Sequence, residues 1–448
     1  MKSSFFTFGC KLNQCETEAL ADAFEKQGFQ IEEFEKPSDI YVINTCTVTS
    51  KSEQKARRII RKASRDYPES LVIVTGCYAQ LETEVISSLG ENVLSIPLDQ
   101  KDLIMDLAGF LASDHTSREN LYKQASFWLE TQSSGIDDPS GRFRFSAADF
   151  NFHARAFLKI QDGCDNRCAY CRVCLARGSS VSLDSSTVIN RLKELENSGY
   201  REVVLTGINI DSYSDGNKNL SDLLELILEE TQHFRIRLSS LEPKTLLDSD
   251  LSILSHPRIC PHFHVSAQSG SDTVLERMNR NYEAHLVKDA VLRLRELKSD
   301  PFIAADIIAG FPGENDEEHE ETIALLKELQ FSRIHVFPFS PRPGTAAWDM
   351  RPSVPQRIAG VRTSEIRDIS HSSHQDYFER WIGRNVDVLL EEIKESDGIS
   401  YWEGTSGNYL KVRIPSKQFS ESDESLRGAI VSCRIELHRN YCCYASAV

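Results

Sequence analysis

The stretch "GCDNRCAYCRVC", residues 163–174, sets Cys164, Cys168, Cys171 and Cys174 on one short segment. The apolar run "AFLKI" (156–160) directly precedes it, so we expect the cysteines on a loop that follows a strand. Four thiols would enclose a metal completely, whereas three would hold a cluster with one metal left open. A closed site would carry structure or electrons, and an open one would permit catalysis.

The spacing of these cysteines favours an open cluster. Cys164, Cys168 and Cys171 form C-x3-C-x2-C, and closely spaced thiolates suit an iron–sulfur cube because soft sulfur ligands favour iron. The last three cysteines also form C-x2-C-x2-C, as in bacterial ferredoxins, but no Cys-Pro follows at the expected place. A zinc site needs two paired elements, and the other close pair is the adjacent Cys442-Cys443. We therefore predict an open cluster on the first three thiols, with Cys174 as a packing residue.

Strands and helices alternate from residue 155 onward. Six short apolar runs separated by amphipathic stretches predict six parallel strands of an incomplete β/α barrel, whose site lies at the C-terminal mouth. The runs after "AFLKI" are "EVVLTG", "RIRLSS", "HFHVSAQ", "FIAADIIAG" and "SRIHVFPF". Asn209 and Gln268 follow the second and fourth runs, and Asp306 lies within the fifth.

The first 90 residues repeat one pattern three times. "FFTF", "YVIN" and "LVIVT" each lead into a cysteine, at Cys10, Cys46 and Cys77. Helical stretches after the first two runs predict a parallel sheet, whose strand ends share one edge. The three thiols should therefore converge on a second metal site, although three buried structural cysteines remain the alternative.

The remaining segments have weaker signals. "SSGIDDPSGR" (133–142) is typical of a linker. From about Trp381 onward, short strand-like runs separated by turns predict a small, mostly antiparallel β-barrel.

Composition limits the classes of function. The 40% hydrophobic and 26% charged content is ordinary for a soluble globular protein, and 12 cysteines in 448 residues are too dilute for a disulfide scaffold. With no bilayer-length apolar run and no signal-like start, we expect a cytoplasmic protein without membrane association. The net charge of −16 argues against nucleic-acid binding driven by overall charge, but not against a local basic groove.

Several motifs together resemble the radical S-adenosylmethionine (SAM) methylthiotransferases. The cluster loop matches that superfamily, including Tyr170 at the position near the adenine of SAM. Further stretches are most similar to the branch that modifies N6-threonylcarbamoyladenosine at position 37 of tRNA. They are "GCKLNQCETEA", "FLKIQDGC", "LTGINI", "RIRLSSLEP", "QSGSDTVLERMNR", "DIIAGFPGE" and "HVFPFSPRPGT".

The resemblance implies an α/β protein with three domains and a linker. Residues 1–125 would hold an auxiliary [4Fe–4S] cluster, 126–149 a linker, 150–380 a radical SAM partial (β/α)6 barrel, and 381–448 a TRAM-like RNA-binding barrel. The ligands would be Cys10, Cys46 and Cys77 for one cluster and Cys164, Cys168 and Cys171 for the other.

In such an enzyme, one SAM methylates a sulfur on the auxiliary cluster, and another yields a 5′-deoxyadenosyl radical that starts replacement of the adenine C2–H by a methylthio group. The cofactors perform this step because the bond is unactivated. We expect Asn209, Gln268 and, less strongly, Asp306 to contact SAM, although each also suits a structural polar role. The implied partners are the tRNA anticodon loop and an electron donor such as flavodoxin or ferredoxin, while no motif indicates the sulfur donor.

Alternatives remain open. The substrate could instead be isopentenyladenosine tRNA or a ribosomal protein, and a nonenzymatic electron carrier would use both cysteine groups as closed clusters.

The chain departs from the branch at several positions. Cys15 replaces an aromatic residue, so we expect it to be incidental. "RVCLARG" (172–178) stands where "IIPYARG" is usual, which makes Arg172 and Cys174 unusual.

The RNA-binding prediction has little support from charge in the tail. From Trp381 onward eight Lys or Arg face ten Asp or Glu, a net charge of −2. Lys411 and Arg413 alternate on one strand, and Arg427, Arg434 and Arg439 would add to them. A second basic patch lies between Lys55 and Arg65. Solvated surface charge is the alternative interpretation of both patches.

Overall fold

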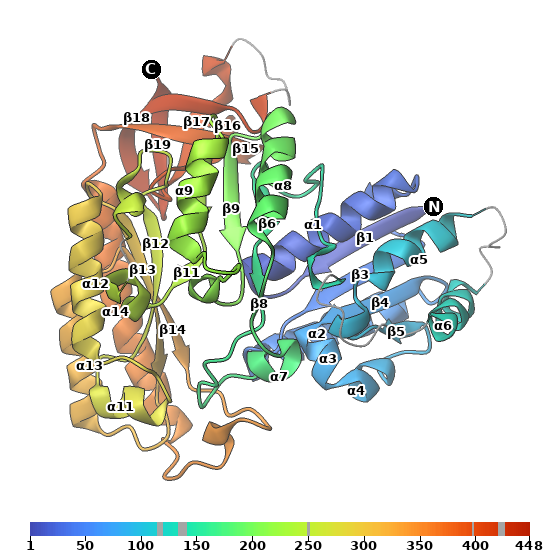
Figure 1. The fold of residues 1–448 in the computed structure, drawn as a ribbon, viewed down its shortest axis with the longest axis horizontal. Coiled ribbons are helices and arrows are strands. Elements are labelled where there is room, and N and C mark those ends of the chain that lie inside the picture. The colour runs from blue at the N-terminus through green and yellow to red at the C-terminus, as the bar shows by residue number, and fades with distance from the viewer. Residues whose placement is uncertain (114–119, 133–140, 249–250, 397, 420–425) are drawn as a thin grey trace.

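The computed structural model describes residues 1–113, 120–132, 141–248, 251–396, 398–419 and 426–448. It has three parts, an amino-terminal sheet, a central open barrel and a small closed barrel (Figure 1). Among the described residues, no helix is long and apolar enough to cross a membrane.

The first part is a parallel sheet in the strand order β2-β1-β3-β4-β5, which confirms the predicted α/β domain. β3 and β4 are buried throughout because helices cover both faces. The strands are β1 Lys2–Thr7, β2 Gln30–Glu32, β3 Ile40–Thr45, β4 Leu71–Gly76 and β5 Val93–Ser95. The helices are α1 Lys11–Lys26, α2 Ser50–Asp66, α3 Cys77–Leu81, α4 Thr83–Ser87, α5 Leu103–Ala112 and α6 Leu121–Thr131, with the 3-10 turn η1 Leu98–Gln100.

Local signals set the ends of the first two helices. Gly28 follows α1 with a φ of +83°, and its amide bonds the carbonyl of Glu25, as expected where glycine ends a helix. Thr49 caps α2 by accepting from the amide of Ser52. Both helices therefore begin just after a cysteine loop, with Cys10 itself the N-cap of α1.

The predicted linker, 126–149, lies partly outside the described residues. α6 extends to Thr131, past the predicted start of the linker, and residues 133–140 are not described. A 3-10 turn, η2 Gly141–Phe143, leads toward the central part.

The central part is an open barrel of six parallel strands, which confirms the predicted radical SAM-like architecture. Its third strand is interrupted at Ser239, so that β10 pairs with β9 while β11 pairs with β12. The strands are β6 Ala156–Lys159, β9 Glu202–Thr206, β10 Arg235–Leu238, β11 Ser240–Leu241, β12 His262–Gln268, β13 Phe302–Ala309 and β14 Arg333–Pro338. A separate ribbon, β7 Gln161–Asp162 and β8 Val181–Ser182, lies beside the cysteine loop.

Helices surround this barrel and join it to the other parts (Figure 1). They are α7 Val173–Arg177, α8 Ser185–Asn197, α9 Leu220–Glu230, α10 Pro243–Asp248, α11 Asp272–Arg277, α12 Ala284–Leu297, α13 Asp316–Leu329 and α14 Gln356–Glu379. The 3-10 turns are η3 Ile210–Ser212, η4 Leu251–Ser255 and η5 Ala346–Trp348.

The carboxy-terminal part is a closed five-stranded barrel in the order β15-β16-β17-β19-β18, antiparallel except for the β17–β19 pair. This confirms the predicted small, mostly antiparallel barrel. Its strands are β15 Asn385–Ser396, β16 Ile399–Ser406, β17 Lys411–Pro415, β18 Ile430–Arg439 and β19 Cys442–Ala447, with the 3-10 turn η6 Ser416–Gln418.

One hydrophobic core runs through the first and central parts. Cys15 on α1 and Phe157 on β6 belong to this core, and the Cys15 thiol lies 3.7 Å from the Phe157 carbonyl oxygen. Burial raises the pKa of Cys15 to about 12, so the group packs as a neutral thiol. The first part is therefore held firmly against the barrel that it faces.

Candidate active site

The three amino-terminal cysteines lie together at one edge of the first sheet. Cys10 follows β1, Cys46 follows β3 and Cys77 begins α3 directly after β4. Burial, with the nearby Cys10 and Cys77, raises the pKa of the Cys46 thiol to about 12. The loops touch closely, because a Cβ on Gly9 would lie only 2.9 Å from the sulfur of Cys46. This close approach requires glycine at position 9, where φ is +97°.

The second group of thiols lies on the loop between β7 and α7. Cys164, Cys168 and Cys171 are partly exposed, and each lies near enough to the others to influence their charge. The loop is fixed by its backbone, since the Ala169 amide bonds the Met278 carbonyl and the Cys164 amide bonds the Gly178 carbonyl. The barrel therefore presents these thiols at its mouth, as the sequence predicts.

Cys174, the fourth cysteine of the stretch, contacts the backbone of the loop. Its thiol donates to the Cys171 carbonyl at 3.6 Å from within α7. Burial raises the pKa of Cys171 to about 12, with a smaller contribution from Cys174. The thiol of Cys174 thus has a backbone partner beside the loop.

A polar shell that sequence reasoning missed surrounds Cys168. Arg280 donates from Nη1 to the Cys168 sulfur at 3.1 Å and from Nη2 to Glu242 at 3.1 Å. Asn166 on the cysteine loop donates to the same Glu242 oxygen at 2.6 Å. Glu242 follows the interrupted third strand, so its place at a strand end was the available signal, whereas nothing local marked Arg280.

Asp211 lies in the same shell. Its Oδ2 accepts from the Glu242 amide at 2.5 Å, while its buried Oδ1 has no hydrogen-bond partner among the described atoms. Burial, with the neighbouring Glu242, raises the pKa of Asp211 to about 8. A carboxyl with a raised pKa therefore lies at the mouth of the barrel, two residues beyond Asn209.

The predicted SAM contacts differ in their surroundings. The backbone N–H of Asn209 donates to Oε1 of Gln161, and Nε2 of Gln161 donates to the Gly163 carbonyl, so Asn209 lies beside the cysteine loop. Gln268 ends β12 and is buried with a left-handed φ of +64°. Asp306 lies within the sheet, with its carboxylate 3.1 Å from the imidazole of His264.

Tyr170, the remaining predicted SAM contact, precedes the third cysteine of the loop. Its ring lies 6.5 Å from that of Phe311, in an edge-to-face arrangement.

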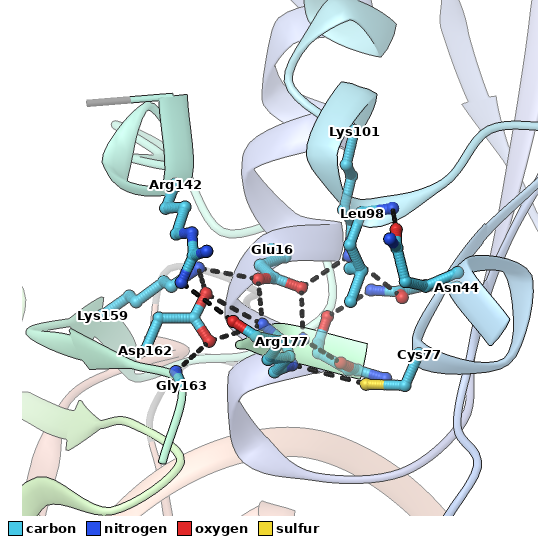
Figure 2. A network of polar contacts seen from close by, with 12 residues as sticks. Glu16, Asn44, Cys77, Leu98, Lys101, Arg142, Lys159, Asp162, Gly163 and Arg177 are labelled. Carbon is cyan, nitrogen blue, oxygen red and sulfur yellow. Dashed lines mark hydrogen bonds and ion pairs between the residues drawn. The ribbon is translucent and has the colours of Figure 1, made fainter. Parts of the chain in front are cut away.

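A buried charge network joins the two cysteine groups, and consists of Glu16, Lys101, Lys159, Asp162 and Arg177 (Figure 2). Each of these side chains is at most 5% exposed. Glu16 lies on α1 of the first part, whereas Asp162 and Arg177 flank the second cysteine loop. The network therefore binds that loop to the first domain.

Arg177 extends the network to the first cysteine group. Its Nε donates to the Cys77 sulfur at 3.4 Å, and its Nη2 donates to Asn13 at 2.9 Å. Asn13 in turn donates to the carbonyls of Phe8 and Thr45, which precede the other two cysteine loops. One guanidinium thus contacts or supports all three loops of the first group.

The carboxylates of the network are fewer than its basic side chains. By formal charge, the three basic side chains of Lys101, Lys159 and Arg177 exceed the two carboxylates of Glu16 and Asp162 by one, and burial lowers the pKa of Lys101. An uncompensated buried charge is costly. The network's contact with the first cysteine group is the Arg177 guanidinium, 3.4 Å from the Cys77 sulfur.

Comparisons with known proteins identify the family. Residues 2–96 match the "Uncharacterized protein family UPF0004" and residues 158–326 match the "Radical SAM superfamily". A Treponema pallidum protein named threonylcarbamoyladenosine tRNA methylthiotransferase MtaB is 40% identical, with 91% of this chain and 97% of that protein covered. The protein of the same name from Bacillus subtilis is 34% identical, with 96% and 93% covered. The chain belongs to the radical SAM methylthiotransferase family.

Other relatives add to this identification. A protein from Endomicrobium trichonymphae named tRNA-2-methylthio-N(6)-dimethylallyladenosine synthase is 30% identical to this methylthiotransferase, with 87% and 88% covered. The structure of the radical SAM methyltransferase TsrM from Kitasatospora setae, with cobalamin and a [4Fe-4S] cluster, has a TM-score of 0.50 at 14% identity, with 78% and 77% covered. That likeness shows the fold alone. The predicted family is confirmed, and a nonenzymatic carrier is disfavoured because the family consists of enzymes.

The cysteine groups of this methylthiotransferase fit iron–sulfur clusters. Among the described residues, no three His, Cys, Asp or Glu side chains stand close enough to hold a single metal ion. A [4Fe–4S] cluster would take each thiolate on a different iron, so its ligands need not meet at one ion. Thiol-only donors of this kind favour iron–sulfur cubes over hard cations.

Arg172 explains one departure from the branch pattern. The side chain is buried and lies 3.4 Å from Glu53 and 3.0 Å from Glu82, both in the first domain. Arg342, beyond β14, also pairs with Glu53. In this methylthiotransferase the unusual arginine therefore helps to join the cluster loop to the first domain.

Proposed function

We propose that this methylthiotransferase replaces the C2 hydrogen of N6-threonylcarbamoyladenosine, at position 37 of tRNA, by a methylthio group. Relatives named for this substrate are 31–40% identical to the chain, whereas two relatives named for dimethylallyladenosine are 30% identical. The higher identity over nearly full length supports the first substrate.

We further propose two [4Fe–4S] clusters. The observation that carries this proposal is the presence of two separate groups of three thiols, the first of which the Arg177 guanidinium contacts at 3.4 Å from the Cys77 sulfur. Thiolates are the form in which cysteine binds metal. The first cluster is assigned to Cys10, Cys46 and Cys77, and the second to Cys164, Cys168 and Cys171.

The chain's own residues position these cofactors. When bound, the clusters and SAM would supply the methyl group, the iron that carries sulfur, and the radical chemistry that an unactivated C–H bond requires. Arg280 orients Cys168 and neutralises charge beside it, while Glu242 holds Arg280 in place. The raised pKa of Asp211 favours its protonated form, which is suited to donate a hydrogen bond at the barrel mouth.

Contacts to SAM are assigned to residues around the second cysteine loop. Tyr170 precedes the third cysteine, Asn209 follows β9 beside the cysteine loop, and Gln268 ends β12. Asp306, deeper in the sheet, stays a predicted contact.

The proposed division of the chain follows the three parts. Residues 1–125 hold the auxiliary cluster, 150–380 form the radical SAM core after the linker 126–149, and 381–448 form the TRAM-like barrel. The substrate region is the anticodon loop, and the electrons come from a small carrier such as flavodoxin or ferredoxin in the cytoplasm.

Nucleoside mass spectrometry tests the substrate. Transfer RNA from a deletion strain, with no redundant enzyme present, should lose 2-methylthio-N6-threonylcarbamoyladenosine and keep the unmethylthiolated nucleoside. Restoration by the intact gene is the control. Loss of the dimethylallyladenosine derivative instead would reassign the substrate, and loss of neither would refute a tRNA substrate.

Iron analysis tests the two clusters separately from the substrate. Anaerobically reconstituted protein should contain about eight irons per chain, since each cube holds about four. A value near four would refute the two-cluster assignment without affecting the family.

A further inference from the structure

We propose that the exposed face of α2 binds the sugar–phosphate backbone of the tRNA substrate, an inference that rests on the proposed function. Within a chain of net charge −16, this helix concentrates seven cations between residues 51 and 65. Phosphate contacts from Lys and Arg supply much of the affinity of nucleic-acid binding. α2 therefore offers a local basic surface that the overall charge conceals.

The cations form a stripe along the helix. Lys51, Lys55, Arg58, Lys62 and Arg65 are all exposed and recur every three or four residues. The opposite face packs into the domain, and the stripe presents about one cation per turn over about 21 Å at 1.5 Å per residue. A polyanion with regularly spaced charges fits this surface better than a single ion.

Few carboxylates compete for the stripe. The two acids of α2 are Glu53, which is buried against Arg342, and Asp66, which pairs with Arg65. Among the described residues, the recorded ion pairs give no carboxylate partner to the other four members of the stripe or to Arg61. A hollow on this helix is lined by side chains that are nearly all basic. They are Gln54, Arg57, Arg58, Arg61, Lys62 and Arg65.

The carboxy-terminal barrel differs in this respect. Its predicted RNA-binding cations Lys411 and Arg413 lie 2.6 and 2.9 Å from the buried carboxylate of Glu403, and Lys394 lies 3.1 Å from it. One carboxylate therefore partly neutralises three of the barrel's basic residues. The unpaired cations of α2 are better placed to release counterions on binding phosphate.

The amino-terminal end of α2 lies close in sequence to the first cysteine group. Its first residue, Ser50, is four residues beyond Cys46, and its hydroxyl contacts Ser340 at 3.1 Å and Arg342 at 3.0 Å, both beyond β14. A nucleic-acid strand that crosses the joint between the first domain and the barrel mouth would continue along α2. RNA is favoured over an acidic protein because the family relatives are named for tRNA.

Salt-dependent binding of the reconstituted full chain to its tRNA tests this surface. The variant Lys55→Gln/Arg58→Gln/Lys62→Gln removes three stripe cations with little change in helix propensity. Its matched control is Lys193→Gln/Lys288→Gln/Arg293→Gln, because those exposed helical cations already pair with Glu230, Glu328 and Glu296. Circular dichroism and the melting temperature establish that each variant is folded.

We expect weaker tRNA binding for the stripe variant only. The slope of log Kd against log salt should become shallower by roughly 2–3, since each lost phosphate contact removes about 0.7–0.9. If wild type binds tRNA and the stripe variant keeps the same slope, the α2 surface is refuted while the proposed function stands. If the variant instead loses binding only to poly-glutamate, the surface takes an acidic polypeptide and the proposal fails. If wild type shows no binding to tRNA, the proposed function fails first.

Discussion

Replacement of Glu16 by Gln should strongly destabilise the joint between the first domain and the barrel. The Glu16 carboxylate is 1% exposed and lies 2.5, 2.9 and 3.0 Å from Lys101, Lys159 and Arg177. In the variant, three buried cations would face Asp162 alone, so the excess positive charge rises from one to two. Removing one partner of a buried ion pair costs about 3–5 kcal/mol, because the remaining charge is uncompensated.

The melting temperature of the full chain, measured anaerobically by circular dichroism, checks this magnitude. At an unfolding entropy of about 2.1 cal/mol/K per residue, a chain of 448 residues shifts by about 1 °C per kcal/mol, so the Glu16→Gln variant should melt roughly 3–5 °C lower. The matched control is Glu230→Gln, whose pair with Lys193 is exposed and contributes less than about 1 kcal/mol.

A compensating variant separates charge imbalance from simple loss of packing. Adding Lys101→Met to Glu16→Gln returns the excess charge to one, so the double variant should be more stable than Glu16→Gln alone. A shift for Glu16→Gln no larger than that of Glu230→Gln would refute the reasoning. A further loss of stability in the double variant would refute the charge balance specifically.

Three further outcomes follow from the same geometry. Cys171→Ala should lower the iron content after reconstitution from about eight to about four per chain, whereas Cys174→Ala should keep it; equal loss in both would make Cys174 a ligand. Arg280→Gln removes a hydrogen bond to the Cys168 sulfur and should lower the reduction potential of that cluster in an EPR-monitored titration, and an unchanged potential would contradict this role. Burial alone would raise the pKa of Glu16, but the three cations of the network outweigh it and hold that pKa well below its usual range. Because the folded-state pKa is depressed, the stability from Glu16 is present above about pH 4.5 and should be lost as pH falls further, while unfolding of Glu16→Gln followed by circular dichroism should depend less on pH there.

Much of the fold was predictable because its signals are local. The three runs that lead to Cys10, Cys46 and Cys77 form adjacent or near strands of a parallel sheet, and Gly28 ends α1 as its position indicated. The six barrel strands and the small closed barrel were also predicted, although the interruption at Ser239 was not. That interruption depends on which neighbour each half of the strand pairs with, and pairing is not encoded in periodicity.

The candidate site was predicted only as far as its cysteines and strand-end residues. Arg280 and Cys168 are 112 residues apart, and Arg177 and Cys77 are 100 apart, so no local pattern connects them. The basic face of α2 was visible in the sequence, but the neutralisation of Lys411 by Glu403 required the paired strands of the barrel.

The sequence by itself therefore determined the thiol spacing, the alternation of strands and helices in the first sheet and the family motifs, because each depends on neighbouring residues. Only the tertiary structure decided how charge is distributed around the thiols. Burial and distance set the strength of an ionic interaction, and both arise from packing between segments that are far apart in the chain. The buried charge network that joins the two cysteine groups is the clearest case, since Glu16 and Lys159 meet across 143 residues.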